Sequence, residues 1–211
     1  MKIDFHVHTI YSKDSMTRLE DLAKKSEKIG IVPAITDHNS IKANEKMRGI
    51  TKSFIPGEEI LTAHGDVIGL YIEEEIPRGI DGYEAIDRIK EQGGIVYLPH
   101  MFDKTRKGAA ELGEKADIIE VLNGRALEKY NKIAEEFAEK NKKLKAAGSD
   151  AHFLFEFGNA YTEVEGFDLD SPKEMLKALK KSKIFGSTNP FVRPATSIVK
   201  ALKKLFKPKL P

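Results

Sequence analysis

The chain has 211 residues, a formal net charge of +2 and no cysteine. This length suits one domain with a substantial core, and the lack of cysteine excludes disulfides, thiolate metal ligands and cysteine nucleophiles. The charged start of the sequence lacks the apolar segment of a signal peptide, and no apolar run approaches the roughly 18 residues of a membrane span. We therefore expect one domain over residues 1–211, without a transmembrane segment, in a cytoplasmic protein.

Strand-like and helix-like patterns alternate along the chain. A strand at residues 2–8 precedes an amphipathic helix at 17–29, which Gly30 ends. Repeated units of this kind favour a parallel sheet, and six or seven of them fit a closed barrel. No glycine-rich phosphate loop follows the first strand, as a nucleotide-binding open sheet would require. Further strands are predicted at 31–36, 53–61, 66–71, 95–98, 118–122, 144–147 and 161–164, and further helices at 83–92, 126–141 and 172–181.

Polar side chains of metal-binding types stand at the ends of these strands. Because the carboxyl ends of parallel strands meet at one rim of a barrel, we expect these side chains to converge there. Imidazole and carboxylate suit manganese, zinc or iron, and this many groups exceed what one tetrahedral ion needs. Each histidine alone has an ordinary structural explanation, but the repetition of His, Asp, Glu or Asn at six strand ends does not. The groups include Asp4, His6, His8, Asp37, His38, Glu58, Glu59, His100, Glu120, Asn123, Asp150 and His152.

In combination and order these motifs resemble the signature of the PHP (polymerase and histidinol phosphatase) family. The resemblance runs from Met1 to about Thr162. It implies an α/β fold, a distorted TIM-like (βα)7 barrel with the metal site at the C-terminal ends of the strands. It also implies two to three divalent metal ions that hydrolyse phosphate esters. The motifs are His6-Val7-His8, Thr36-Asp37-His38-Asn39, Pro56-Gly57-Glu58-Glu59, His100 and Ser149-Asp150-Ala151-His152.

The resemblance also implies a ligand for each ion. Glu59 would bridge two ions, and Asp4, on the same strand face as His6, is predicted to orient a ligand imidazole. The three ions would be held respectively by His6, His8, Glu59 and Asp150, by Glu59 and His100, and by Asp14, His38 and His152.

One departure from the family pattern follows the motif glutamate. Many relatives have a histidine there in a Gly-His-x-x-Gly context, whereas this chain has Asp66 in that position and His64 two residues earlier. A carboxylate suits a hard divalent ion, so Asp66 is one candidate ligand. His64 is the other, although a loop histidine is more often a surface residue.

The expected reaction is attack of a metal-activated hydroxide on a small-molecule phosphate ester. Asn123 and Arg125 match a loop that lines the family's pocket, and Arg125 and Arg106 are candidates to bind phosphate oxygens. Either arginine is equally explained as a solvated surface charge. The candidate catalytic residues are Glu59, Asp150 and Asp37.

Two other functions remain open at this stage. A metal-dependent amidohydrolase also begins with a His-x-His motif, but that group commonly bridges its metals with a modified lysine, where this chain has a glutamate. A nuclease-like PHP module would act on nucleic acid, but short rim loops favour a small molecule over a polymer. An oligomer is compatible with either function.

A basic amphipathic helix is predicted at about residues 195–207. No acidic residue follows Glu174, and lysines lie opposite the apolar face of this helix. The helix is expected to pack on the barrel or on a partner subunit. A membrane surface or nucleic acid is the alternative. The apolar face comprises Ile198, Val199, Leu202, Leu205 and Phe206.

Overall fold

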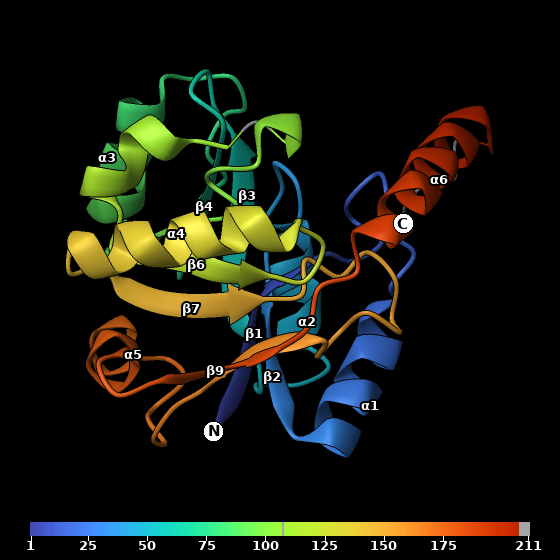
Figure 1. Ribbon diagram of the computed structural model, residues 1–211. Coiled ribbons are helices and arrows are strands. Elements are labelled where there is room, and N and C mark those ends of the chain that lie inside the picture. The colour runs from blue at the N-terminus through green and yellow to red at the C-terminus, as the bar shows by residue number, and fades with distance from the viewer. Residues whose placement is uncertain (107, 207–211) are drawn as a thin grey trace.

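The computed structural model describes residues 1–106 and 108–206, and within them nine strands form a single sheet (Figure 1). The sheet order is β7-β6-β5-β4-β3-β2-β1-β8-β9. The strands are β1 (Lys2–Val7), β2 (Ile31–Ile35), β3 (Ile55–Leu61), β4 (Asp66–Leu70), β5 (Ile95–Leu98), β6 (Ile118–Asn123), β7 (Leu144–Gly148), β8 (Ala160–Glu163) and β9 (Lys183–Gly186). The helices are α1 (Leu19–Ile29), α2 (Lys42–Arg48), α3 (Gly82–Glu91), α4 (Glu128–Lys140), α5 (Pro172–Leu179) and α6 (Arg193–Phe206), with 3-10 turns η1 (Lys104–Arg106), η2 (Ala110–Lys115) and η3 (Pro190–Val192).

The sheet curls until the end of β1 meets the segment that follows β7. The amide of Asp150 donates to the carbonyl of His6 at 2.7 Å, and the amide of His8 donates to the carbonyl of Ala151 at 2.9 Å. These bonds nearly close a barrel, so the predicted α/β, distorted TIM-like fold is confirmed. None of the helices in the described residues is long and apolar enough to span a bilayer.

Two strands depart from a purely parallel arrangement. β4 pairs antiparallel with both β3 and β5, and β8 pairs antiparallel with β1 and β9. The predicted strand at 66–71 therefore forms a hairpin instead of its own strand–helix unit. Only residues 62–65 separate β3 from β4, whereas a parallel crossover needs about a dozen residues or more.

Aromatic side chains pack against each other in the interior of the barrel. The rings of Phe5 and Tyr97 stack with centroids 6.0 Å apart, although β1 and β5 are not neighbours in the sheet. Both side chains are fully buried. The hydroxyl of Tyr97 donates to the buried carboxylate of Glu120 at 2.9 Å, so Tyr97 lies between the apolar interior and buried polar side chains.

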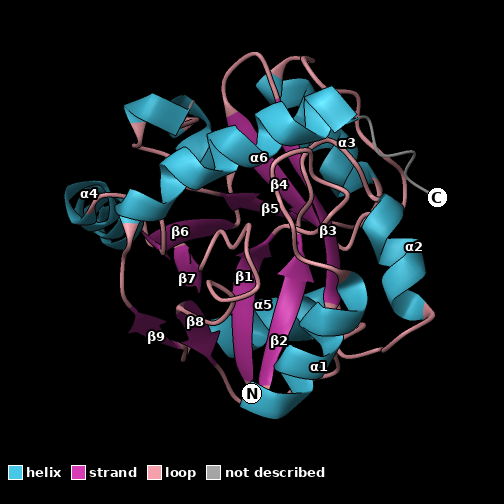
Figure 2. Cartoon of the chain, turned by 90° about the vertical axis from the view of Figure 1, so that its right-hand side faces the viewer, coloured by secondary structure: helices cyan, strands magenta, loops and turns pink. Residues whose placement is uncertain are grey.

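The helix α6 packs on the barrel through its polar face and leaves much of its apolar face exposed. Ile198, Leu202 and Leu205 are 62%, 46% and 77% exposed. Arg193 instead donates to Asp103, and Lys203 donates to backbone carbonyls of the loop after β1. Carbonyls and a carboxylate line this part of the barrel, and they attract cations instead of apolar side chains. In Figures 1 and 2, α6 lies on the side toward which β1 and β2 run.

Candidate metal centre

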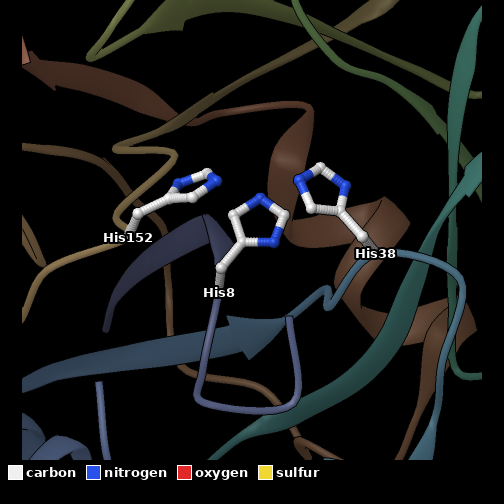
Figure 3. Close-up of side chains that lie close together, drawn as sticks. All are labelled: His8, His38 and His152. Atoms are coloured by element: carbon white, nitrogen blue, oxygen red, sulfur yellow. The ribbon is translucent and has the colours of Figure 1, made fainter. Parts of the chain in front are cut away.

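Two histidines at the end of β1 begin the cluster. The Nε2 atoms of His6 and His8 lie 3.1 Å apart, and both side chains are fully buried. Two ring nitrogens at this distance need a proton or a cation between them, because neither can face the other's lone pair without one. Figure 3 shows the rings of His8, His38 and His152 gathered around one space.

Glu59 lies at the centre of the imidazoles, and its two oxygens face different rings. Oε1 is 3.1 Å from Nε2 of His100 and 3.5 Å from Nε2 of His6. Oε2 is 2.7 Å from Nδ1 of His38 and 3.4 Å from Nε2 of His8. A carboxylate in this position can place one oxygen on each of two cations.

The segment after β7 brings the remaining predicted ligands to the same place. Oδ1 of Asp150 is 3.4 Å from both Nε2 of His8 and Nδ1 of His152. Oδ1 of Asp14 is 3.7 Å from Nε2 of His38 and 3.6 Å from Nε2 of His152. All eight predicted metal-binding residues therefore lie in one cluster.

Backbone conformation fixes two of these residues. His100 and Asp150 have φ angles of 30° and 56°, in the left-handed region that residues other than glycine rarely adopt. Such conformations persist where the surrounding structure demands them, and they are frequent at functional sites. His100 and Asp150 are each the second residue after the end of a strand, β5 and β7 respectively, and their side chains belong to the cluster.

The donor set of the cluster fits divalent cations. Oδ1 of Asp14 is buried and has no hydrogen-bond partner among the described residues, although it faces two imidazole nitrogens. Four groups of three side chains place their donor atoms within 4.8 Å of one another: His8, His38 and His152; His6, His100 and Asp150; His6, His8 and Glu59; and Glu59, Asp66 and His100. Such nitrogen and oxygen donors are typical of multinuclear hydrolase sites.

The charges of the cluster also favour positive ions. Burial lowers the pKa of His6, but the carboxylates of Asp150 and Glu59 outweigh it and raise that pKa well above its usual value. Burial likewise opposes protonation of His38, yet Glu59 raises its pKa to about 9. Burial and the neighbouring His8 hold the pKa of His152 well below its usual value. The carboxylates thus stabilise positive charge that a metal ion would supply in place of protons.

The two candidate ligands after β3 are placed differently. Asp66 lies with Glu59 and His100 in one of the groups above. His64 instead accepts a hydrogen bond at 2.9 Å from the amide of Gly82, at the start of α3. The geometry therefore favours Asp66 as the ligand and gives His64 a part in holding the helix.

We expect Asp66→Ala to reduce metal occupancy by about one ion and to leave the other ions bound. His64→Ala is the matched control, because it removes a polar side chain two residues away without touching the cluster. Elemental analysis of the metal-loaded variants measures the difference. Equal occupancy in wild type and Asp66→Ala, with a loss in His64→Ala, would reverse the assignment.

Glu120, and not Asp4, orients an imidazole of the cluster. Oε1 of Glu120 is 3.1 Å from Nδ1 of His6, whereas Asp4 accepts hydrogen bonds from Ser149, from Gly158 and from the backbone amide of His6 instead of its ring. The prediction for Asp4 was wrong because sharing a strand face does not specify which neighbouring strand supplies the partner. Burial raises the pKa of Asp4 to about 7.

Glu120→Gln is expected to weaken metal binding by roughly tenfold to a hundredfold, the usual loss when a partner of a ligand histidine is removed. Its carboxylate also accepts hydrogen bonds from the backbone amide of His100 and from the side-chain amide of Asn123. The substitution therefore affects the segments that carry His6 and His100. Competition with a chelator measures the affinity. Asp4→Asn is the control, because this carboxylate is equally buried; an equal loss of affinity in both variants would refute the assignment.

Asp37 lies beside the cluster but is directed into the loop after β1. Its carboxylate accepts hydrogen bonds from the amide and hydroxyl of both Thr9 and Ser12, at 2.6–3.1 Å. The hydroxyl of Ser12 also lies 3.2 Å from Nδ1 of His8. These contacts give Asp37 a part in shaping the loop, and they do not bring it to the metal ligands.

The predicted substrate-binding residues are less exposed than expected. Asn123 is buried and donates to Glu120 and Asp150 at 2.9 and 3.1 Å. Nε of Arg125 is 3.0 Å from Oε1 of Glu156, and both side chains are 4% exposed. Arg125 is therefore a buried ion-pair partner, not a solvated surface charge. The side chain of Arg106 lies outside the described part of the chain.

A cavity of about 450 Å³ opens on the cluster. Its lining combines metal-site residues with five cationic side chains from four segments of the chain. The cationic residues are Lys13, Arg78, Arg125, Arg193 and Lys200. Arg78 and the residues of α6 could not be connected with the site from the sequence, because no motif spacing relates them to the histidines.

Comparisons with known proteins identify the family. The PHP-associated family model (PHP_C) matches residues 128–184. An uncharacterized protein of Methanocaldococcus jannaschii is 43% identical over 196 residues, which cover 85% of this chain and 79% of that protein. A two-domain protein of Bacteroides vulgatus, described as containing a predicted PHP-like metal-dependent phosphoesterase, superposes with a TM-score of 0.74. The chain belongs to the PHP family.

Solved structures share the fold of this PHP chain at low sequence identity. The Bacteroides protein is 15% identical, and the match covers 94% of this chain and 69% of that one. PsfC of Pseudomonas syringae has a TM-score of 0.70 at 16% identity, with 95% and 98% of the two chains covered. A lesion-specific endonuclease of Pyrococcus furiosus has a TM-score of 0.64 at 17% identity, with 90% and 59% covered.

Proposed function

We propose that the protein is a metal-dependent phosphoesterase that hydrolyses a small-molecule phosphate ester. The observation that carries this proposal is the cavity, in which cationic side chains surround the opening of a His/Asp/Glu cluster. Phosphate esters have several negative oxygens, which positive charges on opposite sides of a site can stabilise as the reaction proceeds. A neutral amide offers one polarisable oxygen and gives no reason for such a lining.

The ligand sets of this proposal follow the geometry. Glu59 would bridge two ions because its oxygens face separate imidazole pairs. When bound, two or three divalent ions of manganese, zinc or iron would lower the pKa of water and neutralise phosphate oxygens. We assign the ligand role to His6, His8, Asp14, His38, Glu59, His100, Asp150 and His152, with Asp66 added.

The protein's other residues hold the ligands and the substrate. Asn123 positions Asp150 and Glu120 through its amide group. Arg125 lines the cavity while Glu156 fixes its guanidinium, which would donate to a phosphate group bound there. Because α6 also contributes to the cavity, we treat residues 1–211 as one domain.

Hydrolysis of phenyl phosphate by protein stripped of metal, before and after addition of each metal, tests the proposal. We expect activity only after addition, two to three equivalents of bound metal, and inhibition by inorganic phosphate. The same preparation is offered cyclic amides and a single-stranded oligonucleotide. Cleavage of amides without phosphate esters would favour an amidohydrolase, and preference for the oligonucleotide would favour a nuclease.

A further inference from the structure

The helix α6 is attached to both sides of the cavity. Near its start, Arg193 donates to Asp103 and to Thr105, which belong to the segment after β5. Near its end, Lys203 donates to the carbonyls of Ile10 and Ser12 at 3.1 and 2.9 Å, in the loop after β1. The helix therefore crosses the opening of the site between these two attachments.

The polar face between the attachments belongs to the cavity. Thr196, Ser197 and Lys200 all line it, as do Asp14 and His38 of the metal cluster. A helix has 3.6 residues per turn, so Arg193, Thr196, Lys200 and Lys203 lie on one face. Substrate that reaches the metal ions would thus also contact the middle of α6.

Lys200 differs from the other cations of this face. Asp103 neutralises Arg193, and backbone carbonyls hold Lys203 in place. Lys200 is exposed, and within residues 1–106 and 108–206 it has no hydrogen-bond or ion-pair partner. Lys200 lines the cavity without an ion-pair partner of its own among these residues, which is the arrangement expected where the ligand brings the opposite charge.

We propose that Lys200 is a specificity-determining residue that binds an anionic group on the leaving-group side of the substrate. The inference rests on the proposed phosphoesterase function and narrows its substrate to compact phosphate esters with a second anionic group. The helix α6, attached on both sides of the opening, would obstruct a continuous polymer strand. The substrate is accordingly a small molecule.

A matched pair of probes tests this role: phenyl phosphate and its 4-carboxy derivative, which differ by one remote carboxylate. We expect wild type to favour the carboxylated ester about tenfold in kcat/KM, mainly through KM. Lys200→Ala should abolish that preference, and Lys200→Arg should restore part of it. Lys204→Ala is the control, because Lys204 is an exposed lysine of the same helix that does not line the cavity.

Two results would overturn the inference alone. One is an active wild type without preference for the carboxylated ester, and the other is an unchanged preference in Lys200→Ala. Rapid cleavage of an oligonucleotide would contradict the exclusion of polymers. Failure to hydrolyse either ester after addition of metal would instead overturn the proposed function, and the inference with it.

Discussion

Glu59→Gln is expected to reduce turnover by roughly a thousandfold or more, in the range seen when one member of a catalytic unit is removed. The substitution preserves size but removes the charge that faces His6, His8, His38 and His100. The imidazoles of His38, His6 and His100 hold the pKa of Glu59 well below its usual value despite its burial, so the wild-type residue is a carboxylate at neutral pH. Steady-state hydrolysis and metal analysis of the variant measure the effect.

Glu58→Gln is the control for this experiment. Glu58 is also fully buried, but its carboxylate accepts a hydrogen bond from the amide of Ile76 and is absent from the four donor groups found among the described residues. Burial raises its pKa to about 7, so the amide replaces a group that is partly protonated at neutral pH. Turnover of Glu58→Gln should stay near the wild-type value; a similar loss in both variants would refute the bridging role of Glu59.

Gly148→Ala should destabilise the fold by about 3 kcal/mol or more, because the new methyl group has no space. An added Cβ would lie 2.3 Å from Cβ of His6 and 2.7 Å from Oε1 of Glu120. The clash falls where β7 approaches the ligand-bearing end of β1. For a domain of this size, such a loss lowers Tm by roughly 6–12 °C.

Thermal unfolding and metal content of the same preparation measure this prediction. Gly166→Ala is the control, since an added Cβ there meets no atom within 4 Å. We expect Gly166→Ala to unfold at the wild-type temperature and to bind the full complement of metal. If Gly148→Ala did the same, β1 and β7 would not be packed as closely as described.

The sequence predicted most elements because their patterns are long enough to be periodic. Helix α2 was not predicted, since its seven residues span barely two turns and expose little apolar periodicity. The strand at 66–71 was predicted correctly but not its direction, which depends on the short connection to β3. The residue pattern predicts whether a segment is a helix or a strand, whereas the direction in which strands pair depends on the length of the chain that connects them.

The site was predictable to the extent that strand ends determine it. Most of the ligands lie near or just after the C-terminal ends of strands, so their convergence followed from the barrel. Two pairs could not be predicted: Glu120 with His6, and Glu156 with Arg125. Both depend on which side chains meet across the barrel. The orientation of α6 depends on the loops that it covers, so helical periodicity gave its two faces but not which one packs.

Lys203 links the C-terminal helix to the loop that carries Asp14, because it binds carbonyls on both sides of that residue. Two binding events that share one segment are coupled reciprocally: each strengthens the other by the same free energy. If attachment of α6 orders the loop and so strengthens binding of an ion at Asp14, the bound ion strengthens the attachment of α6 by the same free energy. Metal removal should consequently loosen a helix that contributes no ligand, nearly 190 positions along the chain from Asp14.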